Sequence, residues 1–223
     1  DCYPLSVKIK VIIQIIIVSI MVWATELRFD SFGHSFGLDK QIHLGIFSYP
    51  ITIMGVVFVT NAFNLMDGAD GVAGSLVLLS IVGINIVEIF SGHYNFNILS
   101  LAILGSLVPY FYFNLIKSKE KKVFLGDSGS LFLGYSVACL LLYESQIQNN
   151  FSPPFALWVI AIPIFDVISV MVYRFRNSRP LFSPDRSHLH NFFQRLGFSN
   201  RLVLISIIGS GIFCLMLGSA IEY

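Results

Sequence analysis

Long apolar stretches, each close to the length of a membrane-spanning helix, run through the 223-residue sequence. The clearest stretch, residues 45–66, has no charged side chain and would form a helix about 33 Å long. Charged residues make up only 12% of the chain, against about 25% in an average soluble domain. Too few polar side chains are available to cover a water-soluble globule of this size. The sequence therefore predicts an integral membrane protein.

The apolar stretches predict an all-α, polytopic membrane protein that forms a single domain over residues 1–223. A transmembrane helix needs about 20 predominantly apolar residues, and this rule marks seven spans in the chain. The predicted spans are Val11–Thr25, Phe47–Phe63, Val72–Phe90, Ile98–Ile116, Gly129–Tyr143, Phe155–Tyr173 and Leu202–Ile221.

The positive charges gather on alternate loops of this arrangement. With a cytoplasmic N-terminal end, only Arg28 and Lys40 of the 14 Lys and Arg residues lie outside. The inside set is Lys8, Lys10, Lys117, Lys119, Lys121, Lys122, Arg174, Arg176, Arg179, Arg186, Arg195 and Arg201. This asymmetry follows the positive-inside rule and predicts that the chain starts inside and ends outside. The net charge of +1 excludes the strong basic field typical of nucleic-acid-binding proteins.

Several carboxylates fall on the same predicted cytoplasmic side as the positive charges. They are Asp1, Asp67, Asp70, Asp127 and Asp185. Carboxylates can hold Mg²⁺ and cations can hold phosphate oxygens, so the mixture suits metal-dependent phosphate chemistry. The alternative is that acids simply favour hydrated helix ends, and charge alone does not separate the two interpretations. The outer acids, Glu144 among them, stand in stretches without a motif.

The first motif, residues 61–71, follows the second predicted span. Its two Asp-Gly pairs predict the end of that helix, because glycine adopts the backbone angles that end helices. Asn64, Asp67 and Asp70 are spaced three apart and share one face of a continuing helical turn. They could act as oxygen ligands or proton acceptors, or they could be only a polar capping turn. An EF-hand is excluded, because the ligand spacing and the closing glutamate are missing.

The second motif, residues 123–130, leads into the fifth predicted span. Its GDSGS letters invite a serine-protease reading with Ser128 as nucleophile, but a catalytic triad is recognised by geometry and not by a short string. Asp127, at a predicted helix start between glycines, suits a metal ligand or a helix cap. The lysine run before it, residues 117–122, is typical of an anchor to anionic lipid.

The third motif, residues 183–190, lies in the long loop after the sixth predicted span. Arg186, His188 and His190 suit the binding of phosphate or sugar hydroxyls, while a zinc site would need further ligands. A solvated basic loop remains the alternative. Within the sixth span, Asp166 is a deep carboxylate that is either functional or hydrogen-bonded to a neighbouring helix.

Together the three segments resemble the polyprenyl-phosphate N-acetylhexosamine-1-phosphate transferase family. Residues 61–74, NAFNLMDGADGVAG, resemble its N-A-x-N-x-x-D-G-x-D-G-L-x-G element, with Val72 where Leu is usual. Residues 123–135, VFLGDSGSLFLGY, resemble F-x-G-D-x-G-S-x-x-x-G. Residues 183–197, SPDRSHLHNFFQRLG, resemble the P-D-R-x-H-x-H-H element of the GlcNAc-1-phosphate branch, with Asn191 where another histidine is usual.

The start of the chain also resembles a family element. Residues 1–10 are similar to the part that begins at the second residue of an Asp-Asp pair. The resemblance implies that the first Asp and about three preceding helices are missing from a parent of about ten or eleven helices.

The resemblance implies a reaction, its cofactor and its partners. A sugar-1-phosphate, best taken as GlcNAc-1-phosphate, passes from a UDP-N-acetylhexosamine to undecaprenyl phosphate in the lipid bilayer, and UMP is released. Two anions must approach each other, so Mg²⁺ is the implied cofactor, with Mn²⁺ as a substitute. The implied location is the bacterial plasma membrane, with the site on its cytoplasmic face, and a homodimer is left open.

Residue roles also follow from the resemblance. The implied catalytic residues are Asp1, Asp67, Asp127 and His188; the substrate-binding residues are Lys10, Asp70, Phe124, Arg186 and His190; the metal ligands are Asn64 and Asp127. In this scheme Asp1 orients or deprotonates the lipid phosphate, while Lys10 and Arg186 contact phosphates. Phe124 and Asp70 face the uracil, and His188 serves the sugar or the diphosphate.

Two rival functions remain at this point. A transporter or lipid flippase would place its charges near the middle of the membrane, whereas here the acids gather at one surface and only Asp166 is deep. An inactive fragment of the transferase, acting as an assembly partner, is the second rival.

Overall fold

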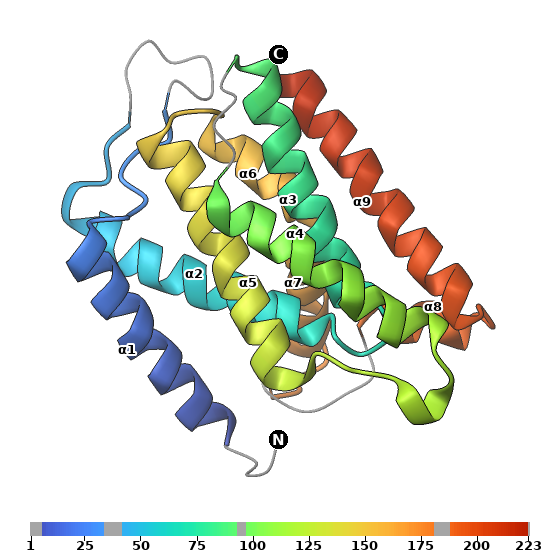
Figure 1. Ribbon diagram of the computed structural model, residues 1–223. Coiled ribbons are helices and arrows are strands. Elements are labelled where there is room, and N and C mark those ends of the chain that lie inside the picture. The colour runs from blue at the N-terminus through green and yellow to red at the C-terminus, as the bar shows by residue number, and fades with distance from the viewer. Residues whose placement is uncertain (1–5, 34–41, 93–96, 181–187, 223) are drawn as a thin grey trace.

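The protein is a bundle of helices in the computed structural model, which describes residues 6–33, 42–92, 97–180 and 188–222 (Figure 1). The helices are α1 Val7–Thr25, η2 Gly45–Phe47, α2 Ser48–Leu65, α3 Val72–Phe90, α4 Ile98–Phe111, η3 Tyr112–Ile116, η4 Lys119–Lys121, α5 Gly126–Leu142, η5 Tyr143–Ile147, α6 Pro153–Val159, α7 Ala161–Arg176, α8 Leu189–Arg195 and α9 Asn200–Glu222. Over these described ranges no strand forms, and a lone bridge pairs Ser31 with His43. The predicted all-α class is confirmed.

Six continuous helical segments are long and apolar enough to cross a bilayer. They are Val7–Thr25, Gly45–Leu65, Val72–Phe90, Ile98–Ile116, Gly126–Ile147 and Asn200–Glu222. Each overlaps a predicted span, and most begin or end within a few residues of it. The polytopic architecture expected from the apolar stretches is therefore confirmed.

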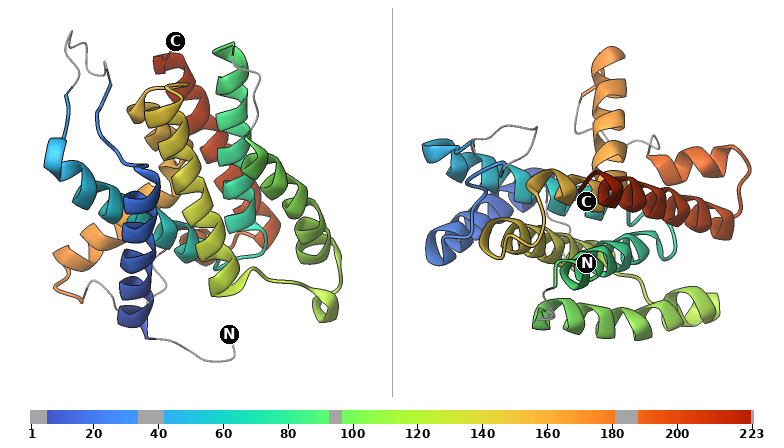
Figure 2. Two further views of the ribbon diagram at one scale, coloured as in Figure 1. Left: turned by 60° about the vertical axis from the view of Figure 1, so that its left-hand side comes forward. Right: turned by 90° about the horizontal axis from the view of Figure 1, so that it is seen from above.

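The remaining predicted span, Phe155–Tyr173, is apolar enough to cross a bilayer only as a bent pair of helices and not as one continuous helix. α6 and α7 meet at Ile160 with a bend of 80°. Pro163 accounts for the break, because it has no N–H for the carbonyl of Val159 and its ring would crowd that carbonyl. The freed Val159 carbonyl accepts a hydrogen bond from Ser80 Oγ at 3.3 Å. α7 consequently leaves the bundle sideways (Figure 2).

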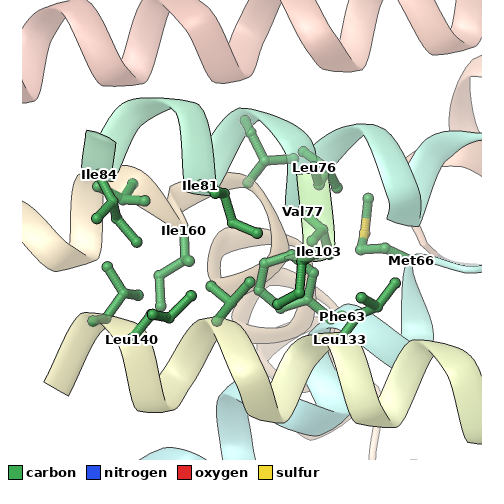
Figure 3. Packing of buried hydrophobic residues seen from close by; sticks show 14 of the residues in the cluster. Phe63, Met66, Leu76, Val77, Ile81, Ile84, Ile103, Leu133, Leu140 and Ile160 are labelled. Atoms are coloured by element: carbon green, nitrogen blue, oxygen red, sulfur yellow. The ribbon is translucent and has the colours of Figure 1, made fainter. Parts of the chain in front are cut away.

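The hydrophobic core is centred on α3. Inside the protein, 72% of the α3 span is buried, against 11% of the α1 span at the edge. Side chains of α3 and α5 interlock there, with Ile81 and Ile84 on one side and Leu133 and Leu140 on the other (Figure 3). In a bilayer such close packing, rather than escape from water, holds helices together.

The backbones of α2 and α5 approach each other closely at Gly134. A Cβ at this position would lie 2.9 Å from Phe63 Cβ and 3.0 Å from the Thr60 carbonyl oxygen. Only a glycine lets the two backbones approach this closely. The contact is near the end of the bundle that carries Lys10, Asp67 and Asp127, which we call the site end.

Two buried glutamates lie at the opposite end of the bundle. Glu88 of α3 and Glu144 of η5 are 1% and 2% exposed, and their carboxylates adjoin. Asn150 Nδ2 donates to Glu144 Oε2 at 2.7 Å. The sequence analysis found no motif around Glu144 and took Asp166 as the one deep carboxylate, whereas the structure buries Glu88 and Glu144 as well. The sequence does not indicate this pair, because the two residues are far apart along the chain.

The α2–α5 contact can be tested by adding one methyl group. Gly134→Ala should destabilise the protein by about 1–3 kcal/mol, because the new Cβ meets helix backbone that cannot move aside. Gly105→Ala is the matched control, since no atom lies within 4 Å of a Cβ there. Thermal unfolding in detergent should show a lower melting temperature for the first variant alone. Equal melting temperatures for both variants would contradict the contact.

Candidate functional site

The site end brings together segments that are distant in the sequence. It comprises the start of α1, the end of α2 with the loop of residues 66–71, the start of α5, and α8 (Figure 1). The loop reverses the chain within six residues, and Gly71, with φ of +74°, is the N-cap residue just before α3. A left-handed backbone of this kind favours glycine. The first motif (residues 61–71) and the second motif (residues 123–130) therefore lie next to Lys10 and to the histidines of the third motif.

Asp127, in the first turn of α5, is the centre of one cluster. Lys10 Nζ of α1 donates to Asp127 Oδ2 in a direct ion pair. Asn64 Nδ2 of α2 donates to Asp127 Oδ1 at 3.3 Å and to Ser130 Oγ at 2.8 Å. Three residues predicted for the site from separate segments therefore lie in contact. Ser130, which the sequence analysis did not select, fixes the Asn64 amide.

Asp67 lies beside this cluster and has an unusual proton affinity. Burial of its carboxyl group and the nearby charge of Asp127 raise its pKa from 3.8 to about 6, while a hydrogen bond from the Gly126 backbone N–H lowers it. The two carboxylates thus repel each other, and Asp67 is the one that takes up a proton near pH 6. A cation placed between them would relieve the repulsion.

Asp70 forms a second ion pair on the same loop. Lys122 Nζ donates to Asp70 Oδ2, and both side chains are largely shielded from solvent. Tyr110 of α4 lies close enough to interact with the charges of both Asp67 and Asp70. Lys122 was predicted only as part of a lipid anchor, because a lysine run carries no signal for one specific partner.

His190 packs directly on the acid-bearing loop. A Cβ on Gly68 would collide with His190 Nε2, so only glycine allows this approach. The His190 ring stacks on His188 with centroids 6.1 Å apart and planes at 1°. Burial and the neighbouring His188 lower the pKa of His190, so its ring is neutral at pH 7. The histidine motif is therefore held against the first motif through His190.

His188 is held from its other side by Asp166 of α7. The distance from His188 Nδ1 to Asp166 Oδ2 is 2.7 Å, and both side chains are buried. The sequence analysis left open whether Asp166 is functional or bonds to a neighbouring helix. Its partner is a histidine of the third motif, which sequence spacing does not reveal, because 22 residues separate the two.

The other predicted site residues are placed less closely. Phe124 is 64% exposed and stands at the surface beside Val123, whose carbonyl accepts a hydrogen bond from Asn114 Nδ2 at 2.8 Å. Asp1 and Arg186 lie outside the described residues. Their roles remain predictions.

The donor set at the site end fits a magnesium ion. Mg²⁺ is usually bound by one or two carboxylates together with substrate phosphates and water. Asp127 and Asp67 supply two neighbouring carboxylates, and Asn64 supplies an amide. Within the described ranges no group of three or more His, Cys, Asp or Glu side chains could hold a metal by itself. The arrangement suits an ion whose remaining ligands come from a substrate phosphate and water.

The proton affinity of Asp67 predicts a pH dependence of stability in metal-free buffer. The folded protein holds the Asp67 proton up to about pH 6, whereas the unfolded chain releases it near 3.8. Stability should therefore fall as the pH rises from about 4 to 6, because ionisation is costlier in the folded state. Melting temperatures measured with a chelator should show this slope.

Two variants test the origin of that slope. Asp67→Asn should abolish the fall in stability with pH. Asp127→Asn should confine that fall to a smaller pH range, because the Asp127 charge contributes to the raised pKa of Asp67. A wild-type slope retained in Asp67→Asn would mean that another group is responsible.

Comparison with known proteins identifies the family of the chain. Residues 1–145 match the family model for glycosyl transferase family 4. The whole chain is 36% identical to "Undecaprenyl-phosphate alpha-N-acetylglucosaminyl 1-phosphate transferase" of Escherichia coli (strain K12), and it covers 61% of that protein. For the protein of the same name from Yersinia pestis, the identity is 34% over 98% of this chain and 60% of the relative.

A relative from Bacillus subtilis (strain 168) is similar to the same extent. It is named "Probable undecaprenyl-phosphate N-acetylglucosaminyl 1-phosphate transferase", and it is 36% identical over 93% of this chain and 57% of its own length. The chain thus spans about three-fifths of the length of these relatives. The family match extends over the Asp67, Asp70 and Asp127 segments, and it shows that the chain belongs to glycosyl transferase family 4.

Proposed function

We propose that the protein transfers a sugar-1-phosphate, most simply GlcNAc-1-phosphate, from a UDP-sugar to undecaprenyl phosphate and releases UMP. The observation that carries this proposal is the mixed cluster at the site end, where Lys10 and Lys122 accompany Asp127, Asp67 and Asp70. Phosphoryl transfer between two anions depends on such positioning and charge neutralisation. The relatives named above support the choice of acceptor and sugar.

The cations at the site end are suited to bind phosphate oxygens. Lys10 and Lys122 each pair with a carboxylate, and each lysine can turn toward a phosphate when that carboxylate is otherwise engaged. Asn64, Asp67 and Asp127 would hold Mg²⁺, which when bound neutralises charge on the diphosphate. Asp67, with its pKa of about 6, is ionised at neutral pH and available as an oxygen ligand or proton acceptor.

The substrate contacts in this proposal follow the sequence analysis. Phe124 is accessible enough to stack on a uracil ring, and Asp70 accepts hydrogen bonds beside it in the proposed scheme. His188 and His190 serve the sugar or the diphosphate. Arg186 contacts phosphate, and Asp1 orients the lipid phosphate. The attacking phosphate of a membrane lipid lies at the headgroup plane, where a site at one end of a bundle can reach it.

A transporter or flippase is a weaker proposal for this arrangement. Transporters hold coupling charges at broken helices near the middle of the membrane. The helix break at Ile160 meets part of this description, but Asp166 beyond it pairs with His188, whose ring stacks on His190 at the site end. An inactive fragment of the transferase is the other alternative, and the turnover assay below tests it when run on residues 1–223 alone.

Turnover of the complete gene product is the direct test of the proposal. It should release UMP from UDP-GlcNAc when undecaprenyl phosphate and Mg²⁺ are both present, and chelation should stop the release. Asp127→Ala should lower kcat at least about 10²-fold, because the cluster loses its central carboxylate. Ser128→Ala is the matched control, since Ser128 is exposed, and it should stay within about threefold of wild type. Unchanged turnover in Asp127→Ala would overturn the metal assignment.

Side-specific labelling tests the proposed cytoplasmic site in the bacterial plasma membrane. In a cysteine-free background, Ser118→Cys lies near the site end and Gln148→Cys lies at the opposite end, and both positions are exposed. A membrane-impermeant maleimide added to intact spheroplasts should modify the Gln148→Cys variant but not the Ser118→Cys variant. The reverse pattern would place the site on the outer face.

A further inference from the structure

Asp166 is a buried carboxylate with two specific hydrogen-bond partners. It lies on α7 and is 6% exposed. Its Oδ2 is 2.7 Å from His188 Nδ1, and its Oδ1 accepts a hydrogen bond from the Leu189 backbone N–H at 2.6 Å. Each oxygen therefore contacts one of two successive residues of the histidine motif. A carboxylate held in this way has one orientation.

This contact determines which nitrogen of His188 carries a hydrogen. An ionised carboxylate only accepts hydrogen bonds, so Nδ1 must be the protonated nitrogen of the pair. Nε2 is then the ring atom that remains for another partner. The second bond, from Leu189 N–H, satisfies a donor in the first turn of α8, which begins at Leu189.

The break in the membrane helix explains how Asp166 reaches this position. Pro163 ends the regular helix at Ile160, and α7 continues at 80° to α6. Asp166 lies six residues beyond Ile160, on the α7 face that also buries Val167 and Val170. In a straight helix Asp166 would lie within the membrane span. The bend instead brings its carboxylate to His188.

His188 in turn connects Asp166 to the acidic cluster. Its ring stacks on His190, and His190 packs against Gly68, between Asp67 and Asp70. Gly68 has no side chain, so the ring and the loop are in direct contact. The orientation of His188 is thus set from α7, while its position is set by the first motif.

We propose that Asp166 is a positioning residue that fixes the tautomer and ring orientation of His188 for sugar-phosphate transfer. This inference rests on the proposed function, but the pairing itself can be measured without turnover. The competing interpretation is that Asp166 only caps α8 and stabilises the fold. The two interpretations differ in which substitutions matter.

Asp166→Asn separates the two interpretations at one position. The amide oxygen can keep the bond to Leu189 N–H, and the NH₂ group then faces His188 Nδ1. That nitrogen must become an acceptor, so the proton of the neutral ring moves to Nε2. Capping is preserved and the tautomer is reversed. Leu189→Pro does the opposite: proline is tolerated at the first helical position and leaves the Asp166 carboxylate in place, but it removes the N–H donor together with a partly buried leucine side chain.

The tautomer is read by nitrogen NMR of the ¹⁵N-histidine-labelled complete gene product in detergent, with His188→Gln identifying the signal. We expect the proton on Nδ1 in wild type and Leu189→Pro, and on Nε2 in Asp166→Asn. Glu144→Gln, which changes a buried carboxylate at the opposite end, is the matched control and should leave the His188 signal unchanged. An unchanged tautomer in Asp166→Asn would overturn the inference.

Kinetics with UDP-GlcNAc and undecaprenyl phosphate complete the test. Asp166→Asn should lower kcat by about 10²-fold and change KM less than about threefold, a typical cost of misorienting a functional imidazole. The double variant with His188→Gln should be no slower than His188→Gln alone. Asp166→Glu should recover part of the activity, and Leu189→Pro should keep kcat within about threefold.

The outcomes separate this inference from the function on which it rests. Full kcat in folded Asp166→Asn, or a loss of stability with normal kcat, would reduce Asp166 to a helix cap and overturn the proposal. Absence of UMP release by the wild type would instead overturn the proposed function, whatever tautomer His188 adopts.

Discussion

The close approach of α2 and α5 at Gly134 is the contact on which the candidate site depends. With no side chain at this position, the α5 backbone lies against Thr60 and Phe63. One turn further along the pair, Asn64 reaches Asp127 and Ser130. Small residues favour helix packing in a bilayer, because close van der Waals contact takes the place of the hydrophobic effect as the attraction between helices. The same packing that stabilises the bundle thus places an amide and a carboxylate at one point.

Holding several carboxylates at that point requires that each negative charge be compensated. Asp127 pairs with Lys10, Asp70 pairs with Lys122, and Asp166 contacts His188. Asp67 is compensated least, and the result is its pKa of about 6. Lysine side chains have several rotatable bonds, so lysines that compensate the carboxylates can change partners, which fixed dipoles cannot do. A metal ion bound by the carboxylates would release lysines for phosphate, which is the behaviour that phosphoryl transfer needs.

Much of the fold could be predicted from the sequence, and the exceptions have identifiable causes. Six of the predicted spans are continuous helices in the structure. They could be predicted because hydropathy is a sum over neighbouring residues and needs no knowledge of the tertiary structure. The break at Ile160 was missed although Pro163 is visible in the sequence, because proline is tolerated in some membrane helices when nearby groups satisfy the freed carbonyl. Here Ser80 does so from another helix. The Glu88 and Glu144 pair was missed for a similar reason, since only tertiary packing brings α3 and η5 together.

The sequence by itself determined the membrane class and the three motifs with their family resemblance, and it predicted the side on which the charges gather. These properties depend on composition and local spacing, which the chain order preserves. Only the tertiary structure decided which side chains meet: Lys10 with Asp127, Lys122 with Asp70, and Asp166 with His188. Pairing depends on distances through space, and these are set by a glycine contact, a proline break and a shared core that no single segment contains.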